Sequence, residues 1–143
     1  MRHVICDVDD TVASAFWRED LIGNGWDEYH SQLHLDKPIE PVLEMLRALE
    51  RCNYVIVGCT ARPEKWRKLT MEWMIKHDVP MHALLMRPEG DFRPARELKV
   101  DLVKDYFKTN LDTVSLVLDD REDVVEAFRA LGITALRVMA KEP

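Results

Sequence analysis

Short apolar runs alternate along the chain with segments in which apolar residues recur every three or four positions. A short apolar run bounded by polar residues is typical of a buried strand, and the second pattern is typical of an amphipathic helix. We predict five strands, at residues 3–6, 54–59, 82–86, 113–118 and 133–138. Helices are predicted between them, at residues 38–51, 63–77, 96–108 and 121–131.

Each predicted helix has one apolar stripe that we expect to pack on the sheet. The first two stripes are Val42, Met45, Leu46 and Leu49, then Trp66, Leu69, Trp73 and Met74. Pro38 and Pro41 fall in the first turn of the first helix, where a missing N–H costs little.

Lys99 shares a helix face with Leu102, Val103 and Tyr106, which are apolar and therefore expected to face inward. This places Lys99 at the buried N-terminal end of that face, whereas Lys104 lies on another face. The alternative for Lys99 is an aliphatic stem that carries its charge out to solvent.

Alternating strands and helices predict an α/β fold, in which a parallel sheet carries helices on both faces. Such sheets bind ligands at the carboxyl ends of their strands. The unusual polar segments follow the first four strands: residues 7–10 ("DVDD"), 60–62 ("TAR"), 87–93 ("RPEGDFR") and 119–123 ("DDRED"). Each alone is compatible with a helix cap, but together they predict a binding site at one rim.

The 143 residues fit one domain, and 47% hydrophobic with 32% charged residues is an ordinary globular balance. A net charge of −6 argues against a broad basic surface for nucleic acid, but not against a local phosphate site. We expect the three cysteines to be buried thiols in a reducing cytosol. No signal peptide or membrane span is recognised, which predicts a cytoplasmic protein without membrane contact.

The rim residues suit metal-assisted phosphate chemistry. Mg²⁺ binds a few carboxylates and keeps other positions for water and phosphate, and Asp7, Asp9 and the Asp119–Asp120 pair are such donors. Arg62 with Thr60 can hold a phosphate, because the guanidinium fork matches its oxygens.

These segments resemble the motifs of the haloacid dehalogenase (HAD) superfamily of phosphatases: "DVDDT", "TAR", the lysine and "LDDR". The segments "CTARPEKWRKLTMEWMIKH", "LLMRPEGDFRPARELK" and "LVLDDREDVVEAFRALG" resemble the 3′-phosphatase domain of phage polynucleotide kinase. The resemblance covers nearly the whole chain. It implies a HAD-like Rossmannoid three-layer sandwich over residues 1–143, with a five-stranded parallel sheet and a small cap or flap at about 12–37.

The resemblance also implies residue roles. Asp7 would be the nucleophile, and Asp9 the general acid and base that also gives its backbone carbonyl to Mg²⁺. Thr11 would support that loop, while Thr60 and Lys99 would hold the transferring phosphoryl group. Asp119 and Asp120 would complete the metal site, with the direct ligand left open. The residues implied to contact the substrate phosphate or nucleotide are Arg62, Arg18, Arg87 and Arg93.

The chain departs from the family pattern at Asp10, where glycine is usual, and we interpret Asp10 as a residue that turns the chain. "TAR" replaces serine-glycine-arginine but keeps the hydroxyl and the guanidinium. There is no GxxxxGK[ST] motif, so a kinase or ligase would have to be a separate partner.

The flap contains side chains with two interpretations each. Trp17, Trp26 and Tyr29 can stack on a base or form the core of the flap, and we favour the core. His30 and His34 have the helical spacing of a zinc pair, but no third ligand is evident and we interpret them as solvated.

The resulting hypothesis is a Mg²⁺-dependent phosphatase, of phage type, that acts on the 3′-phosphate of nucleic-acid ends or nucleotides. If the gene is from a phage, the compartment is the cytoplasm of a bacterial host. The alternative enzyme is a 5′(3′)-deoxyribonucleotidase that acts on free nucleotides. An alternative of another class is a non-catalytic module that binds phosphate or nucleotides.

Overall fold

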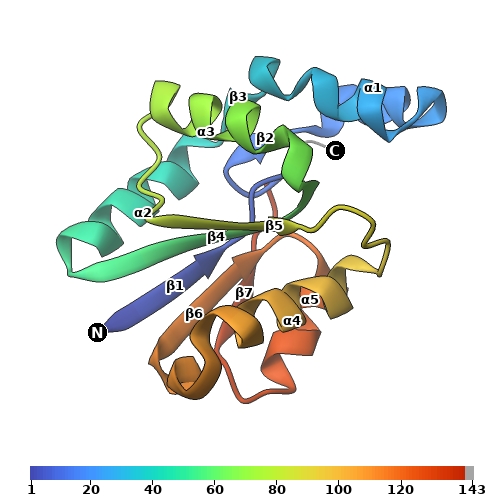
Figure 1. Ribbon diagram of the computed structural model, residues 1–143. Coiled ribbons are helices and arrows are strands. Elements are labelled where there is room, and N and C mark those ends of the chain that lie inside the picture. Colours follow the sequence, from blue (N-terminus) through green and yellow to red (C-terminus); the bar gives the residue numbers. More distant parts are fainter. Residues whose placement is uncertain (141–143) are drawn as a thin grey trace.

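A computed structural model describes residues 1–140 and shows a parallel sheet with helices on both faces (Figure 1). The strand order is β5-β4-β1-β6-β7. The strands are β1 (Arg2–Cys6), β4 (Tyr54–Pro63), β5 (Ala83–Arg87), β6 (Val114–Asp119) and β7 (Ala135–Arg137). All four pairings are parallel, so the predicted α/β class is confirmed.

Two pairs of helices cover the sheet. They are α2 (Glu40–Arg51) and α3 (Arg67–Lys76) on one face, and α4 (Ala95–Phe107) and α5 (Glu122–Arg129) on the other (Figure 1). Short 3₁₀ helices, η3 (Glu64–Trp66) and η4 (Lys108–Thr113), precede α3 and β6. None of the helices in residues 1–140 has the length and apolar run that crossing a bilayer requires.

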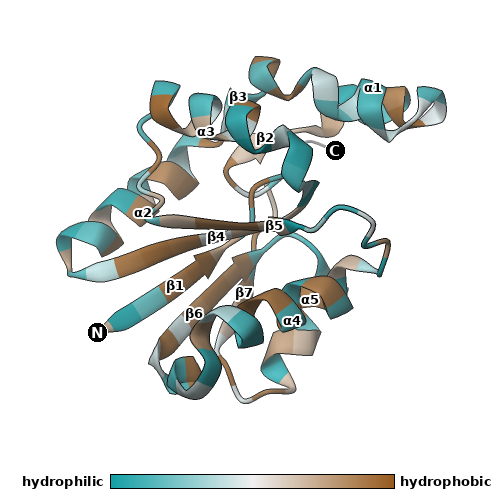
Figure 2. Ribbon diagram, viewed as in Figure 1, coloured by the Kyte–Doolittle hydropathy of each residue, from teal (hydrophilic) through white to brown (hydrophobic). Residues whose placement is uncertain are grey.

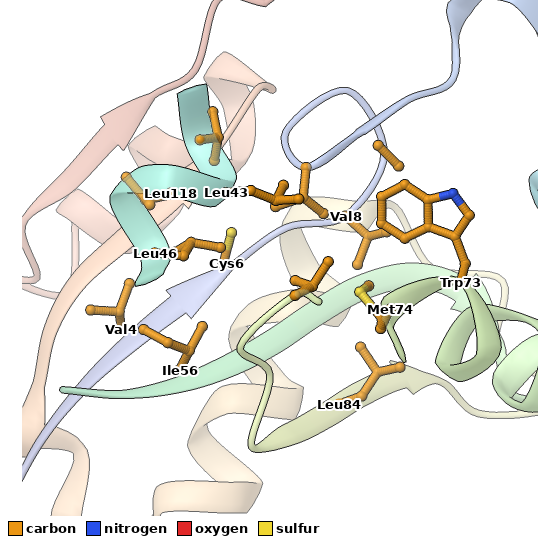
Figure 3. Packing of buried hydrophobic residues seen from close by; sticks show 14 of the residues in the cluster. Val4, Cys6, Val8, Leu43, Leu46, Ile56, Trp73, Met74, Leu84 and Leu118 are labelled. Carbon is orange, nitrogen blue, oxygen red and sulfur yellow. The ribbon is translucent and has the colours of Figure 1, made fainter. Parts of the chain in front are cut away.

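The core lies on both sides of the sheet, because neighbouring strand residues point to opposite faces. Val4 packs in the cluster beneath α2 and α3, and Ile5 in the cluster beneath α4 and α5. Figure 3 shows the first cluster, in which Trp73 and Met74 meet side chains from the strands. In Figure 2 the strands are mostly brown and the outer helix faces mostly teal.

Two predicted stripes are rotated relative to the observed ones. In α2 the buried residues include Leu43, and Met45 is 38% exposed. In α4 Phe107 is buried, and Tyr106 is 50% exposed. Both errors have one cause. Residues three apart and residues four apart lie on the same helix face, and the sequence has apolar residues at both spacings, so it does not decide which set is buried.

Some predicted boundaries were wrong near prolines. Pro38 lies in strand β3, and only Pro41 is in the first turn of α2. β4 continues through the "TAR" segment to Pro63, with a shift of its pairing with β5 after Cys59. The helix predicted from residue 63 therefore begins as η3 and becomes α-helical at Arg67.

An insertion follows β1 and stands above the carboxyl ends of the strands (Figure 1). Its neck is an antiparallel pair of β2 (Ala13–Ser14) and β3 (Lys37–Pro38). Between them lie η1 (Phe16–Asn24), α1 (Trp26–Ser31) and η2 (Leu33–Leu35).

The cysteines do not share one environment. Cys6 and Cys59 are buried in the two core clusters, as expected, but Cys52 is exposed where α2 ends. The prediction of a third buried thiol was wrong, because the helix stops before this side chain reaches the core.

Candidate active site

Asp7 follows β1 directly and is almost fully buried. Its Oδ1 accepts a hydrogen bond from Lys99 Nζ at 2.7 Å, and its Oδ2 accepts one from Thr11 Oγ1 at 2.9 Å. Lys99 Nζ also donates to Asp119 Oδ2 at 2.6 Å. Lys99 therefore joins carboxylates from two strands, and it is buried as predicted whereas Lys104 is exposed.

Three carboxylates gather beside this lysine. Asp7, Asp119 and Asp120 each place an oxygen within 4.8 Å of the others. Burial, followed by the charge of Asp7, raises the pKa of both Asp119 and Asp120. Burial acts to lower the pKa of Lys99, but Asp7 and Asp119 outweigh it and raise that pKa. One ammonium group among three carboxylates leaves negative charge, and oxygen donors of this kind fit a divalent metal ion.

The Asp9 carboxylate binds two guanidinium groups. Arg62 Nη2 donates to Asp9 Oδ1 at 2.7 Å, and Arg18 Nη2 donates to the same oxygen at 3.0 Å. Both arginines also reach Asp36, at 3.3 Å and 2.7 Å, so the four side chains form a ring of alternating charge. Burial would raise the pKa of Asp9, but the two arginines lower it to about 2.

Asp36 is the site residue that sequence analysis missed. Its Oδ1 accepts hydrogen bonds from Arg18 Nε at 2.8 Å and Trp17 Nε1 at 2.9 Å. Its main-chain oxygen accepts one from Trp73 Nε1 at 2.8 Å. The segment around it, "GWDEYHSQLHLDKPIEPV", also resembles the polynucleotide kinase phosphatases, but it has no clear periodicity that would predict this carboxylate to be buried.

Thr60 and Arg62 lie in the last residues of β4, not in a loop. The Arg62 main-chain N–H donates to Thr60 Oγ1 at 3.1 Å, and Arg62 Nη1 donates to Thr70 Oγ1 at 3.1 Å. Both predicted residues are buried. Because the Arg62 guanidinium is bound to Asp9, a phosphate group would compete with that carboxylate for it.

The other predicted arginines have different positions. Arg18 is fully buried against Asp9 and Asp36, which does not support its predicted contact with substrate. Arg87 donates from Nε to Ala61 O at 3.0 Å and from Nη1 to Arg93 O at 2.8 Å, so it holds the loop of residues 88–94.

Arg93 lies in that loop and forms ion pairs with Asp91 and Asp101. Arg87 and Arg93 both line the cavity described below. The structure therefore brings these two arginines, unlike Arg18, to a surface that a ligand can reach.

Asp10 adopts the left-handed backbone conformation, with φ of 61°. Its Oδ1 accepts a hydrogen bond from the main-chain N–H of Ala15 at 2.8 Å. Glycine adopts this conformation without strain, and aspartate tolerates it better than most residues. The interpretation of Asp10 as a residue that turns the chain agrees with this geometry.

Substitutions of Asp10 are expected to separate its backbone role from its charge. Asp10→Asn keeps the acceptor and should unfold at the wild-type temperature. Asp10→Gly loses one hydrogen bond, about 1 kcal/mol. Asp10→Ala also bears left-handed strain of about 1–2 kcal/mol. Thermal unfolding checks the order, and equal losses in all three variants would contradict it.

A cavity of about 1220 Å³ opens at this edge of the sheet. Its walls include Asp7, Asp9, Lys99 and Asp120, together with parts of the insertion and of the 88–94 loop. Pockets for small molecules usually measure about 300–1,000 Å³, so the cavity has room for more than a phosphate group.

The aromatic residues of the insertion divide into buried and exposed groups. Tyr29 is buried with the Arg18 guanidinium 4.3 Å from its ring centre, as a core residue would be. Trp17 and Trp26 are 49% and 59% exposed, and Trp26 lines the cavity. The predicted assignment of all three to the flap core therefore holds for Tyr29 and is wrong for Trp17 and Trp26.

His30 is buried and His34 is exposed, so the prediction of two solvated histidines was wrong for His30. The helix α1 turns His30 inward between Trp26 and Trp66, with ring centroids 5.9 Å and 6.2 Å away. Its Nδ1 has no hydrogen-bond partner among the described residues. Burial lowers the pKa of His30 to about 4 against the attraction of Asp9, so the ring is neutral at pH 7.

His30 is expected to make stability fall with acidity. The pKa of a histidine in the unfolded chain is near 6.5. Between pH 6.5 and 4 the unfolded chain therefore binds a proton that the folded protein does not bind, and the free energy of unfolding falls. Relative to His30→Gln, the wild type should lose up to about 3 kcal/mol from pH 7 to pH 4. Urea unfolding at both pH values measures this, with His34→Gln as control. Parallel curves for wild type and His30→Gln would contradict it.

Comparison with known proteins decides the family. The family model for the polynucleotide kinase PNKP phosphatase domain matches residues 1–142. The chain belongs to the PNKP phosphatase-domain family of HAD phosphatases. The predicted resemblance and the prediction of a phosphatase are therefore confirmed.

Two solved structures of longer chains contain a region similar to this chain. A chain of the Pnkp1/Rnl/Hen1 complex is 28% identical with a TM-score of 0.82, over 96% of this chain and 45% of that one. A chain of the Pnkp1/Rnl/Hen1 RNA repair complex is 27% identical with a TM-score of 0.82, over 96% and 42%. The domain thus spans less than half the length of these relatives.

A more distant structure has the same fold. A haloacid dehalogenase-like hydrolase from Streptococcus pneumoniae is 10% identical with a TM-score of 0.68, over 97% of this chain and 85% of that chain. At this identity the similarity shows the HAD-like fold alone, and it agrees with the predicted three-layer arrangement.

Proposed function

We propose that this phosphatase removes the phosphate from 3′-phosphorylated polynucleotide ends or nucleotides, in a Mg²⁺-dependent reaction through an aspartyl-phosphate. The observation that carries the proposal is the group of Asp7, Asp119 and Asp120 around Lys99, of which Asp7, Asp120 and Lys99 line the cavity. It combines a nucleophile, a fixed cation and metal-binding oxygens at one point.

Asp7 attacks phosphorus, and the bond from phosphorus to the 3′-oxygen breaks. Asp9 gives its proton to the leaving oxygen and later takes a proton from the water that attacks the phosphoenzyme. That second attack releases inorganic phosphate and restores the Asp7 carboxylate. Lys99 and Thr60 are assigned to hold the transferring group, and Thr11 to orient Asp7 through its 2.9 Å hydrogen bond.

We assign the metal site to Asp7, Asp119 and Asp120, with the main-chain carbonyl of Asp9. Mg²⁺ bound there would neutralise charge on the phosphate oxygens, which otherwise face the carboxylates. Asp119 already accepts hydrogen bonds from Lys99 and from the Arg121 main-chain N–H at 3.0 Å. Asp120 is instead hydrogen-bonded to Asp7, a contact that a cation bound between the two carboxyl groups would replace, and we therefore favour Asp120 as the direct ligand.

Arg62 connects substrate binding to the protonation of Asp9. While Arg62 is bound to Asp9, the pKa of this carboxyl is about 2, which suits a carboxylate and not an acid. A phosphate dianion that draws Arg62 away would remove part of this stabilisation and raise the pKa. This change favours the protonated form of Asp9 that the leaving group needs, while Arg18 keeps the side chain in position.

A second candidate is a nucleotidase for free nucleotides, the 5′(3′)-deoxyribonucleotidase type. The insertion wall of the cavity carries Glu19, Asp20 and Asp27, of which Asp27 is paired with Lys65, and the chain has a net charge of −6. These charges would repel a long phosphate backbone at that wall. They favour small substrates or short ends over duplex or long strands.

The decisive experiment compares kcat/KM for a 3′-phosphorylated oligonucleotide, a 3′-mononucleotide and a 5′-mononucleotide. The proposal expects the first two to be preferred. A preference for the 5′-mononucleotide would favour the nucleotidase instead. Absence of turnover on all three would overturn both, and would revive the non-catalytic module.

We also propose that any kinase or ligase activity that works with this phosphatase lies outside the 143 residues. It would belong to a separate partner protein or to another part of a longer chain. Two facts support this. The chain spans 45% of the related chain in the Pnkp1/Rnl/Hen1 complex, and it carries no GxxxxGK[ST] motif.

A further inference from the structure

Two exposed aromatic side chains lie on different walls of the cavity. Trp26, from α1 of the insertion, is 59% exposed, and Phe92, from the loop between β5 and α4, is 91% exposed. Both line the cavity that contains Asp7. Exposed aromatic side chains beside a phosphate site can serve as stacking surfaces for a base.

Trp26 is held in a fixed orientation. Its ring stacks on His30, with centroids 5.9 Å apart and planes at 25°, and it meets Tyr29 edge-on at 5.5 Å. Tyr29 is in turn fixed by the Arg18 guanidinium 4.3 Å from its ring centre. A rigid aromatic surface loses little conformational freedom on binding, which favours its use as a platform.

The charges around Trp26 restrict what can lie on it. Glu19, Asp20 and Asp27 line the same wall, and Lys65, which pairs with Asp27 at 2.5 Å, offsets only one of these charges. The wall therefore stays acidic on balance and disfavours a phosphate group. The wall near Phe92 is mixed in charge, since Arg87 and Arg93 lie there with Glu89 and Asp91, and Arg93 pairs with Asp91. A ligand that suits both walls is flat and uncharged beside Trp26 and carries its anionic part toward Asp7 and the arginines.

We propose that Trp26 and Phe92 form a nucleobase clamp, which stacks the base of the nucleotide whose phosphate lies at Asp7. This inference rests on the proposed function and names its substrate class as phosphomonoesters that carry a base. Stacking is tolerant of base identity, because every base has a π face. The clamp therefore selects nucleotides over other phosphate esters without selecting a sequence.

The test measures binding in the inactive Asp7→Asn protein with Mg²⁺, which needs no turnover. The ligands are a 3′-mononucleotide and the same sugar phosphate without its base. Trp26→Ala and Phe92→Ala are expected to lower the ratio of the two affinities by about 5- to 100-fold, the loss of one stacked base at 1.4 kcal/mol per tenfold. Trp26→Phe should recover part of this ratio.

Ile75→Ala is the matched control, since Ile75 is 75% exposed on α3 and does not line the cavity. An unchanged ratio in both aromatic variants would overturn the clamp, as would equal losses for the two ligands. Failure of the proposed function looks different. In that case the wild type hydrolyses neither ester, while the binding ratio still reports on the clamp.

Discussion

Replacing Asp7 by asparagine is expected to lower phosphatase turnover by at least about 10³-fold while the fold survives, because an amide is a far poorer nucleophile than a carboxylate. Asparagine has nearly the same shape, and its oxygen can still accept the 2.7 Å hydrogen bond from Lys99. The loss of one negative charge also reduces the repulsion at Asp119 and Asp120. We therefore expect little change in the thermal unfolding temperature.

The measurement pairs steady-state turnover with trapping of the phosphoenzyme. After acid quenching with radiolabelled substrate, the wild type should retain a label that hydroxylamine removes, and Asp7→Asn should not. Asp112→Asn is the matched control, because Asp112 is exposed in η4. Substantial residual turnover in Asp7→Asn would disprove the assignment of the nucleophile.

Removal of divalent metal by a chelator is expected to reduce turnover to background, and added Mg²⁺ should restore it. The carboxylates of Asp7, Asp119 and Asp120 otherwise face the phosphate dianion, and the Lys99 ammonium group that binds two of them does not offset all of their charge. Metal bound to the folded state should also raise the unfolding temperature with concentration. Full activity in excess chelator would contradict the metal site.

Asp120→Asn distinguishes a loss of metal affinity from a loss of catalysis. This variant should need a higher Mg²⁺ concentration for half-maximal activity, since an amide is a weaker ligand for a hard cation than a carboxylate. Asp112→Asn again serves as control for the change of charge. An unchanged Mg²⁺ requirement would mean that Asp120 is not the direct ligand.

The sequence alone predicted the positions of those residues that depend on local hydrophobic patterns and on the order of strands and helices. Apolar runs and parallel-sheet logic brought Asp7, Thr60, Lys99 and Asp119 to one rim, because the carboxyl ends of parallel strands must meet there. Burial of Lys99 followed from its place on an amphipathic helix, although that helix uses Phe107 and not Tyr106 as its inner residue.

The internal structure of the insertion could not be predicted from these local patterns. Its elements are short 3₁₀ turns and one short α-helix, which lack a strong hydrophobic period. Asp36 is buried in contact with Arg62, which is distant in sequence, and Arg18 is buried in contact with Asp9 and Asp36. Predicting those contacts requires the packing of the insertion on the sheet, which no local pattern encodes.

The charged ring of Asp9, Arg18, Asp36 and Arg62 has a consequence for recombination between related proteins. Two of its members come from the insertion, one from the loop after β1 and one from β4. A chimera that exchanges the insertion without an arginine and an aspartate at equivalent places would leave Arg62 and Asp9 partly unpaired in a buried site. An exchange of the insertion between related proteins is therefore expected to be tolerated only when the paired residues at the catalytic edge are compatible with it.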